Sequence, residues 1–506
     1  MEGLPKIIEK VKLPVEIRTD PYLLDHSFQG DAVFPAVEAM TLLAVSTQGY
    51  LPHLDVSLIT DARFDKFLST GPTSRLLEAY NDIEVYEDGR IRSKLVTRSR
   101  SPKASITRIM DHVTVQFGEK RRDSWPLPLD FLSALEGVCV DIPSDRLYRD
   151  LVPFGPAYHN AITPLFVSEN GAIGNLQAVA MEGCSGPLGS PFPLDAAFHL
   201  ASAWGQRYSG IVGFPVGIDR RLIYRPTTPG ERYICRIMPA LPLSRAPRFD
   251  IWIYDQHGNP REEIRGLQMQ DVSGGRLSPP QWISNGAQKR SLESIKSQCT
   301  ALSLIELRTV NGLAERALSD EETHRYKKMG TKRKRSYLAA RLCCKSISRQ
   351  LSGDWKTPSS SLTTVSPDGI RPCCPVRDKI LEPFCSVSHD SRFAIAVASD
   401  VRIGVDVEEI SERVCRSREI YMNEKERLLV EASPLGDIEA SVRVWTSKEA
   451  MAKALDMSLA ESWEKVSLKD IGRDRSILEI GGRDHEAFHE GIDDHLFTFV
   501  GRSGRP

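Results

Sequence analysis

The chain holds 506 residues, more than one ordinary core uses, so about two to four domains are expected. Its formal net charge of -1 provides no basic field, which argues against nucleic acid as a partner. No apolar run approaches the roughly 18 residues of a membrane span, and the first residues lack the apolar core of a signal peptide. The ten cysteines are scattered without the Cys-x-x-Cys spacing of a zinc site, so free thiols in a reducing cytoplasm are expected.

The first segment with candidate chemistry runs from Asp25 to Pro35. His26 precedes a predicted helix, for which Pro35 suits the first turn, residues 36–45 are largely apolar and Gly49 is a candidate end. A single histidine before a helix is more often a cap or a satisfied core residue. However, the spacing His-x-x-x-Gly-x-x-x-x-Pro resembles the motif of polyketide synthase and fatty acid synthase dehydratases, which have a double hot-dog fold.

The segments that follow agree with this resemblance, which covers roughly residues 5–273. Residues 80–118 alternate in polarity around a turn at Asp88-Gly89, as antiparallel strands do. A second half repeats the plan, and its residues 249–270 have the pattern of a hairpin. Phe154-Gly155-Pro156-Ala157-Tyr158 is close to the family's Tyr-Gly-Pro-x-Phe loop, with the two aromatic residues exchanged.

Asp195 and His199 open a second predicted helix, which extends to about Arg207. Because they are four residues apart, both side chains lie on one face of this helix. The segment resembles the family's Asp-x-x-x-Gln/His motif. The resemblance makes His26 the catalytic base and Asp195 the catalytic acid, with His199 orienting Asp195.

Dehydration of a 3-hydroxyacyl thioester removes an α-proton and expels the β-hydroxyl. A histidine with a pKa near 6.5 is a workable base at neutral pH. An aspartic acid can protonate the leaving hydroxyl only if its pKa is raised, which burial in an apolar pocket achieves. We expect Phe192, Phe198 and Trp204 to form such a pocket around Asp195 and to raise its pKa.

Glycine, serine and proline dominate the stretch after residue 273, which is typical of a linker. We therefore predict a dehydratase domain over 1–275, a linker over 276–298 and a second domain over 299–506. The linker has little apolar periodicity, so the two domains are expected to be tethered rather than fused.

Ser319 and Glu322 have the capping-box spacing of a helix start, and a basic run follows them. Such a run is usually only a solvated face. Its functional interpretation is binding of coenzyme A phosphates, or of the acidic helix of a carrier protein, through complementary charge. The basic residues are Lys327, Lys328, Lys332, Arg333, Lys334, Arg335, Arg341 and Lys345.

Two carboxylates stand on a predicted strand near residue 406, where apolar and acidic residues alternate. Asp406 and Glu408 are two apart, so they point to one face of the strand. Paired carboxylates of this kind suit Mg²⁺ with phosphate and water as its other ligands. A helix-prone segment farther on adds Glu449, flanked by Lys448 and Lys453, and ammonium groups stabilise the charge of a leaving phosphate.

These two runs and Val387-Ser388-His389 resemble the three motifs of a 4′-phosphopantetheinyl transferase of the larger, pseudo-dimeric type, an α+β fold. The resemblance implies that Asp406, Glu408 and Glu449 hold Mg²⁺, that Glu449 takes the proton of a carrier serine directly or through a water, and that Lys453 stabilises departing 3′,5′-ADP. Arg371-Pro372 stands where the family has Lys-Pro, which leaves the geometry there open. Contacts with coenzyme A are expected from Lys334, Arg335, Arg341, Arg371, Ser388, His389, Lys448 and Lys453.

One further motif matches a metal-binding pattern without the context that such a site needs. His485-Glu486-Ala487-Phe488-His489 matches the His-Glu-x-x-His pattern of zinc proteases. It lies among glycine and aspartate in the last strand region of the transferase resemblance, without an apolar helix around it. A metalloprotease is therefore not expected.

Both implied activities act on an acyl carrier protein: one installs phosphopantetheine on a carrier serine, and the other dehydrates a 3-hydroxyacyl group on that arm. No Gly-x-Asp-Ser carrier signature occurs, so the carrier is a separate partner or part of a longer synthase. Two alternatives stay open for the first domain: a scaffold without activity, and a hot-dog thioesterase or acyl-CoA hydratase. A homodimer through that domain also stays open, while nucleic acid and membrane partners are not expected.

Overall fold

The computed structural model describes residues 5–70, 76–100, 107–118, 127–181, 185–240, 246–284, 292–366, 371–376 and 383–501. The chain forms two compact units, each treated separately below. Unit 1 comprises residues 1–125 and 140–288, and unit 2 comprises residues 126–139 and 289–506. In the described part of the chain, no helix is both long enough and apolar enough to span a membrane.

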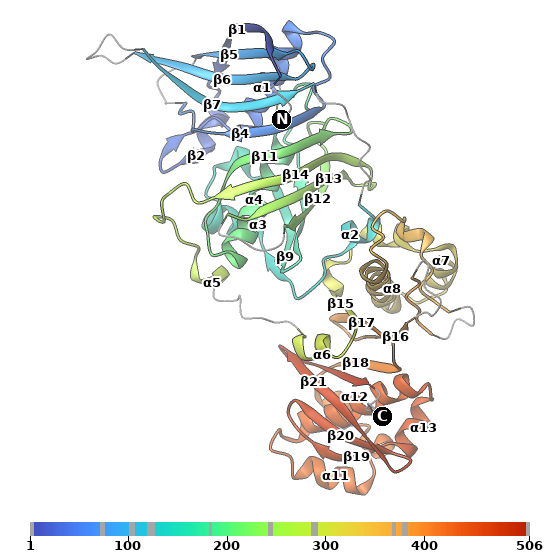
Figure 1. The fold of residues 1–506 in the computed structure, drawn as a ribbon. Coiled ribbons are helices and arrows are strands. Elements are labelled where there is room, and N and C mark those ends of the chain that lie inside the picture. Colours follow the sequence, from blue (N-terminus) through green and yellow to red (C-terminus); the bar gives the residue numbers. More distant parts are fainter. Residues whose placement is uncertain are drawn as a thin grey trace. The chain divides into compact units, whose positions relative to one another are not determined.

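The first half of unit 1 contributes five antiparallel strands to a 12-stranded sheet (Figure 1). Numbered along the chain within this half, the strands lie in the order 1-3-4-5-2, with helix α1 (Ala36–Tyr50) packed on them. Gly49 lies inside the last turn of α1, so it does not end the helix as expected. In sheet order the strands are β1 (Ile7–Arg18), β5 (Leu76–Tyr86), β6 (Ile91–Arg100), β7 (Thr107–Phe117) and β4 (Leu58–Phe64).

Five of the seven strands in the second half repeat this order in mirror image, the other two extend its outer edge, and the halves pair through β4 and β11. Helix α4 (Phe192–Tyr208) is buried along nearly its whole length, and most of its residues are small or apolar. The repeat confirms the predicted double hot-dog fold. In sheet order its strands are β11 (Phe214–Ile223), β14 (Pro260–Gln270), β13 (Arg248–Asp255), β12 (Arg232–Pro239), β10 (Gly171–Gln177), β9 (Ala161–Ser168) and β8 (Val140–Ile142).

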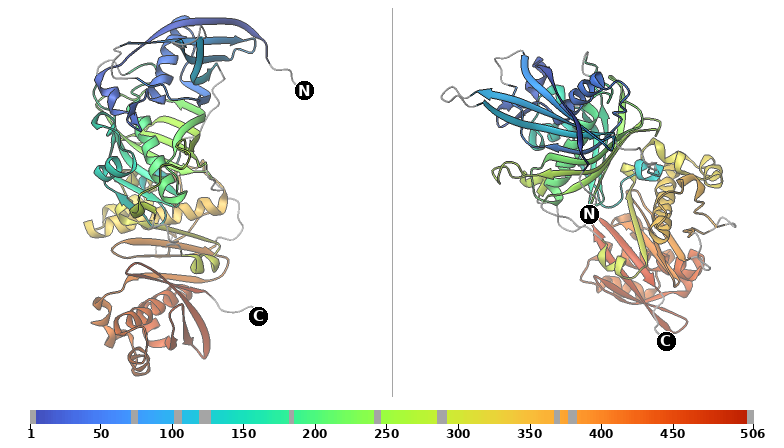
Figure 2. Two further views of the ribbon diagram at one scale, coloured as in Figure 1. Left: turned by 90° about the vertical axis from the view of Figure 1, so that its left-hand side faces the viewer. Right: turned by 45° about the horizontal axis from the view of Figure 1, so that its top comes forward.

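Unit 2 also contains a repeated plan, in which a strand is followed by a long helix and then by a hairpin whose last strand pairs with the first strand. In the first copy the long helix α8 (Thr331–Ser352) covers a three-stranded sheet (Figure 2). Its strands, in sheet order, are β15 (Ala301–Glu306), β17 (Phe393–Ser399) and β16 (Phe384–His389). Ahead of α8, helix α7 (Asp320–Lys327) starts with the predicted capping box of Ser319 and Glu322.

In the second copy the long helix is α12 (Asp437–Leu455), which packs on β18 and β22. This arrangement agrees with the predicted pseudo-dimeric α+β fold. The sheet order is β18 (Ile403–Glu409), β22 (His495–Gly501), β21 (Arg483–Ile492), β20 (Arg475–Ile480) and β19 (Ser467–Ile471). Shorter helices complete the copy: α9 (Glu412–Cys415), α10 (Arg418–Tyr421), α11 (Glu424–Glu431) and α13 (Leu459–Lys465).

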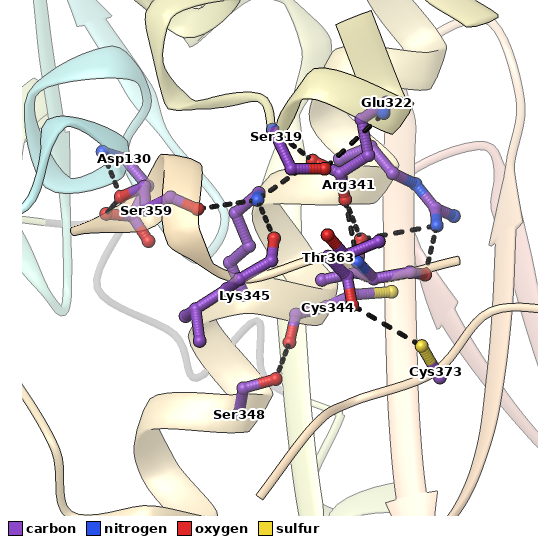
Figure 3. Close-up of polar contacts among 12 residues, drawn as sticks. Asp130, Ser319, Glu322, Arg341, Cys344, Lys345, Ser348, Ser359, Thr363 and Cys373 are labelled. Carbon is purple, nitrogen blue, oxygen red and sulfur yellow. Dashed lines mark hydrogen bonds and ion pairs between the residues drawn. The ribbon is translucent and has the colours of Figure 1, made fainter. Parts of the chain in front are cut away.

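Residues 126–139 lie in sequence between the two hot-dog halves, yet their contacts assign them to unit 2. They include helix α2 (Leu129–Ser133), whose Asp130 carboxylate is buried. Arg349 of α8 lies 2.9 Å from one oxygen of Asp130, and the Ser359 hydroxyl donates to the other. Figure 3 shows how Ser359 links Asp130 to the buried Lys345, which pairs with Glu322 at 2.9 Å. The predicted domain of residues 1–275 therefore contains a segment that packs in the other unit.

The predicted linker 276–298 is also more structured than its composition suggests. Helix α5 (Gln281–Ser284) packs in unit 1, where Arg207 donates to the carbonyl of Ile283 at 3.1 Å. Helix α6 (Glu293–Ser297) packs in unit 2, where the Glu490 carboxylate accepts from two backbone N–H groups at its first turn. Residues 285–291 of the predicted linker lie outside the described residues.

Candidate functional sites

His26 of unit 1 presents an unprotonated ring nitrogen to a cavity. Its Nδ1 lies 2.8 Å from the Val33 carbonyl oxygen, which can only accept, so Nδ1 carries the proton and Nε2 holds the lone pair. The Phe154 ring lies 4.3 Å from the His26 ring, centroid to centroid, in a tilted arrangement, and Tyr158 lies at 5.0 Å. Burial lowers the pKa of His26 against the opposing charge of Asp195, which keeps the imidazole neutral and basic.

Asp195 stands in the first turn of α4, after Pro193, where a helix start favours proline and the backbone N–H groups favour a carboxylate. Its Oδ1 lies 3.9 Å from His26 Nε2, and its Oδ2 lies 3.0 Å from His199 Nε2. The Tyr148 hydroxyl accepts from the N–H of Ala161, so its own proton is available to His199 Nδ1 at 3.3 Å. His199 Nε2 then carries a proton beside Asp195 Oδ2, although neither atom has a hydrogen-bond partner of good geometry among the described residues. The two halves thus bring together all three residues predicted from sequence.

The expected raised pKa of Asp195 is wrong for this structure. Burial raises the pKa, but the neighbouring His199 and His26 outweigh burial, so the pKa lies below its ordinary value. The expectation considered the apolar residues and left out the two imidazoles. Of the three aromatic residues, Phe198 lines the cavity, whereas Trp204 donates its N–H to the Ser168 carbonyl inside the core.

The cavity beside His26 and Asp195 has a volume of about 750 Å³ and a mostly apolar lining. This volume suits an acyl chain with part of its carrier arm. Three aromatic residues, Phe28, Phe67 and Phe214, contact one another along its wall. Phe67 is 45% exposed, so this end of the cavity reaches the surface of the unit.

Glu38 is a residue near this site that the sequence interpretation missed. It accepts hydrogen bonds from the hydroxyls of Tyr158 and Tyr22, each at 2.7 Å. Burial raises the pKa of Glu38 to about 7, against the two hydrogen bonds. An acidic residue inside the apolar run of residues 36–45 was the available signal, and the exchanged aromatic Tyr158 is its partner.

In unit 2, Gly404 allows α12 to approach β18. A Cβ atom at this position would overlap the carbonyl oxygen of Ala450 and lie 2.8 Å from the backbone nitrogen of Ala454. Gly404 shares its strand face with Asp406, so the helix passes directly over this carboxylate. The Thr446 and Thr498 hydroxyls, 2.7 Å apart, also connect α12 to β22. The close approach brings Glu449 and Lys453 to the strand.

Asp406 is buried, and its two oxygens differ in their contacts. Oδ1 accepts from the Ser388 hydroxyl at 2.7 Å and from the Lys453 ammonium at 2.8 Å. Oδ2 is buried without a hydrogen-bond partner. A buried carboxylate oxygen without a partner is costly unless a cation binds it. Ser388, predicted as a coenzyme contact, thus positions Asp406.

The charges around Asp406 fit a hard divalent cation. Burial and the Asp406 charge raise the pKa of Glu449 to about 8, and the same two causes raise the pKa of Glu408. The donor set is all oxygen, as Mg²⁺ prefers, and the lone oxygen of Asp406 faces no other counter-ion. The Glu408 carboxylate pairs with Arg413. A cation bound by all three acids therefore requires Glu408 to leave Arg413.

The predicted coenzyme contacts fall into two groups. His389 and Arg371 are exposed, and Arg371 pairs with Asp456 at the end of α12. In the first turns of α8, Arg335 is exposed and Lys334 lies 4.8 Å from the centroid of a tyrosine ring. The accessible side chains of these four residues can reach a polyanion.

Two other predicted contacts are engaged elsewhere. Lys448 has no exposed surface and donates to Glu426 at 2.8 Å and to the Tyr421 carbonyl, so its prediction as a coenzyme contact is wrong for this conformation. Arg341 is buried and donates to Thr364. Sequence alone did not separate these internal cations from the accessible ones, because their exposure depends on tertiary packing.

The His-Glu-x-x-His motif lies on strand β21 rather than on a helix. On a strand, His485 and His489 are separated by roughly 13 Å, which is too far for one zinc ion. His489 is buried and hydrogen-bonded to Thr498 and Ser476.

Comparisons with known families agree with this geometry. Residues 402–500 match the family model of the 4′-phosphopantetheinyl transferase superfamily, a range that holds Asp406, Glu408, Glu449 and Lys453. Residues 135–279 match the model named polyketide synthase dehydratase N-terminal domain, a range that holds Asp195 and His199. No curated protein matches the chain.

Several solved structures resemble part of the chain. The dehydratase domain of a mycocerosic acid synthase-like polyketide synthase is 18% identical, covers 54% of this chain and 94% of its own, and has a TM-score of 0.42. The dehydratase domain of the CurJ module of curacin polyketide synthase is 16% identical, covers 52% of this chain and 95% of its own, and has a TM-score of 0.43. The dehydratase domain of RzxB from Pseudomonas fluorescens is 14% identical, covers 51% of this chain and 94% of its own, and has a TM-score of 0.41.

The chain therefore combines a polyketide synthase dehydratase part with a 4′-phosphopantetheinyl transferase part. These two matches support both enzyme activities and make the chain a multifunctional protein of polyketide biosynthesis.

Proposed function

We propose that unit 1 dehydrates 3-hydroxyacyl groups on an acyl carrier protein, and that unit 2 transfers 4′-phosphopantetheine from coenzyme A to a carrier serine. Two buried arrangements support the proposal. In unit 1, the neutral imidazole of His26 lies 3.9 Å from the Asp195 carboxylate beside a cavity. In unit 2, helix α12 brings Glu449 and Lys453 close to Asp406. The arrangement around Asp406, with its buried and unpartnered oxygen, carries the transferase proposal.

In the dehydration, His26 Nε2 takes the α-proton of the thioester, and the electron pair of that C–H bond forms the double bond. The bond to the β-hydroxyl breaks as Asp195 gives it a proton, so that water leaves. The lowered pKa of Asp195 means that this proton is scarce at neutral pH. His199 holds the carboxylate in place, and Phe154 packs on the base.

In the transfer, Asp406 and Glu449 would hold Mg²⁺, with Glu408 joining after it leaves Arg413. The ion supplies charge neutralisation for the pyrophosphate of coenzyme A. Glu449 takes the proton of the carrier serine, whose oxygen forms the new bond to phosphorus. Lys453, 29% exposed, stabilises the departing 3′,5′-ADP, while Lys334, Arg335, Arg371 and His389 contact the nucleotide.

Intact-protein mass spectrometry tests the transferase. Candidate apo carriers are incubated with the full chain, coenzyme A and Mg²⁺, and each is expected to gain one phosphopantetheine arm. A holo carrier loaded with a 3-hydroxyacyl group then tests dehydration, which shows as loss of water. If no candidate carrier gains the arm, the transferase proposal fails.

The scaffold and acyl-CoA alternatives for unit 1 are distinguished by substrate. A neutral histidine whose free nitrogen faces a large cavity favours catalysis over a scaffold. Equal conversion of acyl-CoA and acyl-carrier substrates would favour a hydratase instead. No conversion of either substrate, with transferase activity intact, would favour the scaffold.

A further inference from the structure

Three cysteines far apart in sequence meet inside unit 2. Cys344 lies on α8, Cys374 lies shortly before β16, and Cys385 lies on β16 itself. Their three Sγ atoms all lie within 4.8 Å of one another. All three are free thiols; Cys344 and Cys374 have no exposed surface and Cys385 is partly buried.

The spacing is close to that of a metal–thiolate centre. Zinc–sulfur bonds of about 2.3 Å place the sulfurs of a tetrahedral site roughly 3.8 Å apart, so a small contraction brings these three into range. Binding of a divalent cation would deprotonate the three thiols.

The charge around the cluster suits a bound cation. Three thiolates and a divalent ion have a net charge of -1, by formal count roughly balanced by one guanidinium. Arg341 provides this group: it is buried on the same helix, and its Nε has no hydrogen-bond partner. Among the described residues, this is the one group of three His, Cys, Asp or Glu side chains whose ligand atoms lie this close together.

We propose that Cys344, Cys374 and Cys385 form a binding site for a thiophilic cation, with Zn²⁺ as the first candidate. The site has three protein ligands, so its fourth position is free for a small exogenous ligand. Binding Zn²⁺ releases the thiol protons and needs neither oxidant nor reductant.

The position of the site suggests its consequence. The three ligands come from the segments that carry Arg341, Arg371 and Ser388-His389. A cation that joins these segments fixes the backbone from which Ser388 holds Asp406 and from which the proposed coenzyme contacts extend. Cation binding itself does not depend on the proposed transferase activity, so the two can fail separately.

The first experiment measures zinc on the full chain. The reduced protein is equilibrated with Zn²⁺ in excess Mg²⁺, which occupies the carboxylate site, and free metal is removed. Native mass spectrometry is expected to show one Zn²⁺ per chain. Replacing Cys344, Cys374 or Cys385 by serine should weaken binding at least about tenfold.

Cys343→Ser is the matched control, because Cys343 is the buried neighbour of Cys344 but donates to the Ala394 carbonyl on β17. It should keep the zinc, as should Asp406→Ala. Equal loss in Cys343→Ser and in the ligand variants overturns the proposal.

Cobalt provides a measurement that needs no variant. Wild-type chain with Co²⁺ is expected to show a thiolate-to-cobalt charge-transfer band in the near ultraviolet and intense visible bands of a four-coordinate ion. A spectrum of six-coordinate cobalt overturns the proposal. So does protein that takes up no metal and only loses two hydrogens on air oxidation, since a disulfide alone explains that result.

Discussion

The two candidate sites each contain a buried aspartate, but the titratable neighbours of the two aspartates differ. In unit 1, Asp195 has two imidazoles within 3.9 Å, and the pKa of its carboxyl is lowered although it is buried. In unit 2, Asp406 has one ammonium, from Lys453, and two further carboxylates whose pKa values are raised. The first site therefore places one carboxylate beside two imidazoles, whereas the second has an excess of negative charge.

This difference explains the two chemistries. A carboxylate beside imidazoles can move protons without further help, as an elimination of water requires. A surplus of carboxylates binds a divalent cation and, through it, a polyanionic substrate such as a pyrophosphate. The predictions below change one side of this comparison at a time.

The largest effect is expected from His26→Ala and Asp195→Asn, which remove the base and the acid. Each should lower the turnover of dehydration by about 1,000-fold or more, with a smaller change in substrate binding, because both groups act in the transition state. The assay measures the rate at which a 3-hydroxyacyl carrier is converted to the enoyl product. Carrier modification should be unchanged, and dehydration by His26→Ala at the wild-type rate would show that another base exists.

The reciprocal change is Asp406→Ala or Glu449→Ala. Carrier modification at limiting Mg²⁺ should fall by about 100-fold or more, because the cation loses an oxygen ligand. Dehydration of a pre-loaded carrier should continue. Glu409→Ala, an exposed carboxylate on the same strand, is the control and should modify the carrier normally.

Asp130→Ala tests whether residues 126–139 belong to the core of unit 2. The change leaves Arg349 buried without its carboxylate, which should cost unit 2 about 3–5 kcal/mol of stability. Hydrogen exchange should quicken in α8 and stay unchanged in α4. Asp141→Ala, an exposed residue of β8, should change neither helix. For the same reason, residues 286–506 expressed alone should be less stable than the same unit in the full chain.

Glu38→Gln should change how stability depends on pH. The folded pKa of about 7 lies above the ordinary 4.5, so wild-type stability falls as pH rises through this interval, by about 3 kcal/mol in total. The amide of the variant does not titrate, so this decline should disappear. The difference in unfolding temperature between variant and wild type should shift in favour of the variant from pH 5 to pH 8. Glu78→Gln, on an exposed position of β5, should show no such trend.

The smallest effect concerns the pH profile of dehydration. The protonated fraction of Asp195 should decline as pH rises from the acidic range, because its pKa is lowered, and dehydration at neutral pH should be limited by this fraction. His199→Ala removes the neighbour that lowers this pKa most, so the profile should shift to higher pH. His199→Gln keeps a donor without the imidazole and should restore turnover while keeping the shifted profile. An unshifted profile in both variants would assign the decline to another group.

The sequence alone determined the local features of the protein. Short-range spacing predicted His26 before α1, the pair Asp195 and His199 on one helix face, and the two acids of β18, because these depend only on helix and strand periodicity. The capping box of α7 and both fold resemblances follow from the same kind of information.

The tertiary structure alone decided the properties that depend on distant neighbours. The pKa of Asp195 is lowered most by His199 on its own helix and further by His26 from the other hot-dog half, so the apolar residues near it in sequence gave the wrong direction. Whether a lysine binds coenzyme or a buried carboxylate, as Lys448 does, depends on burial that composition does not reveal. The same holds for Asp130 and for the three cysteines, whose partners are brought together only when α8 packs on its sheet. Electrostatic and metal-binding properties act through space over a few ångströms, and the contacts that set them join residues that are distant along the chain.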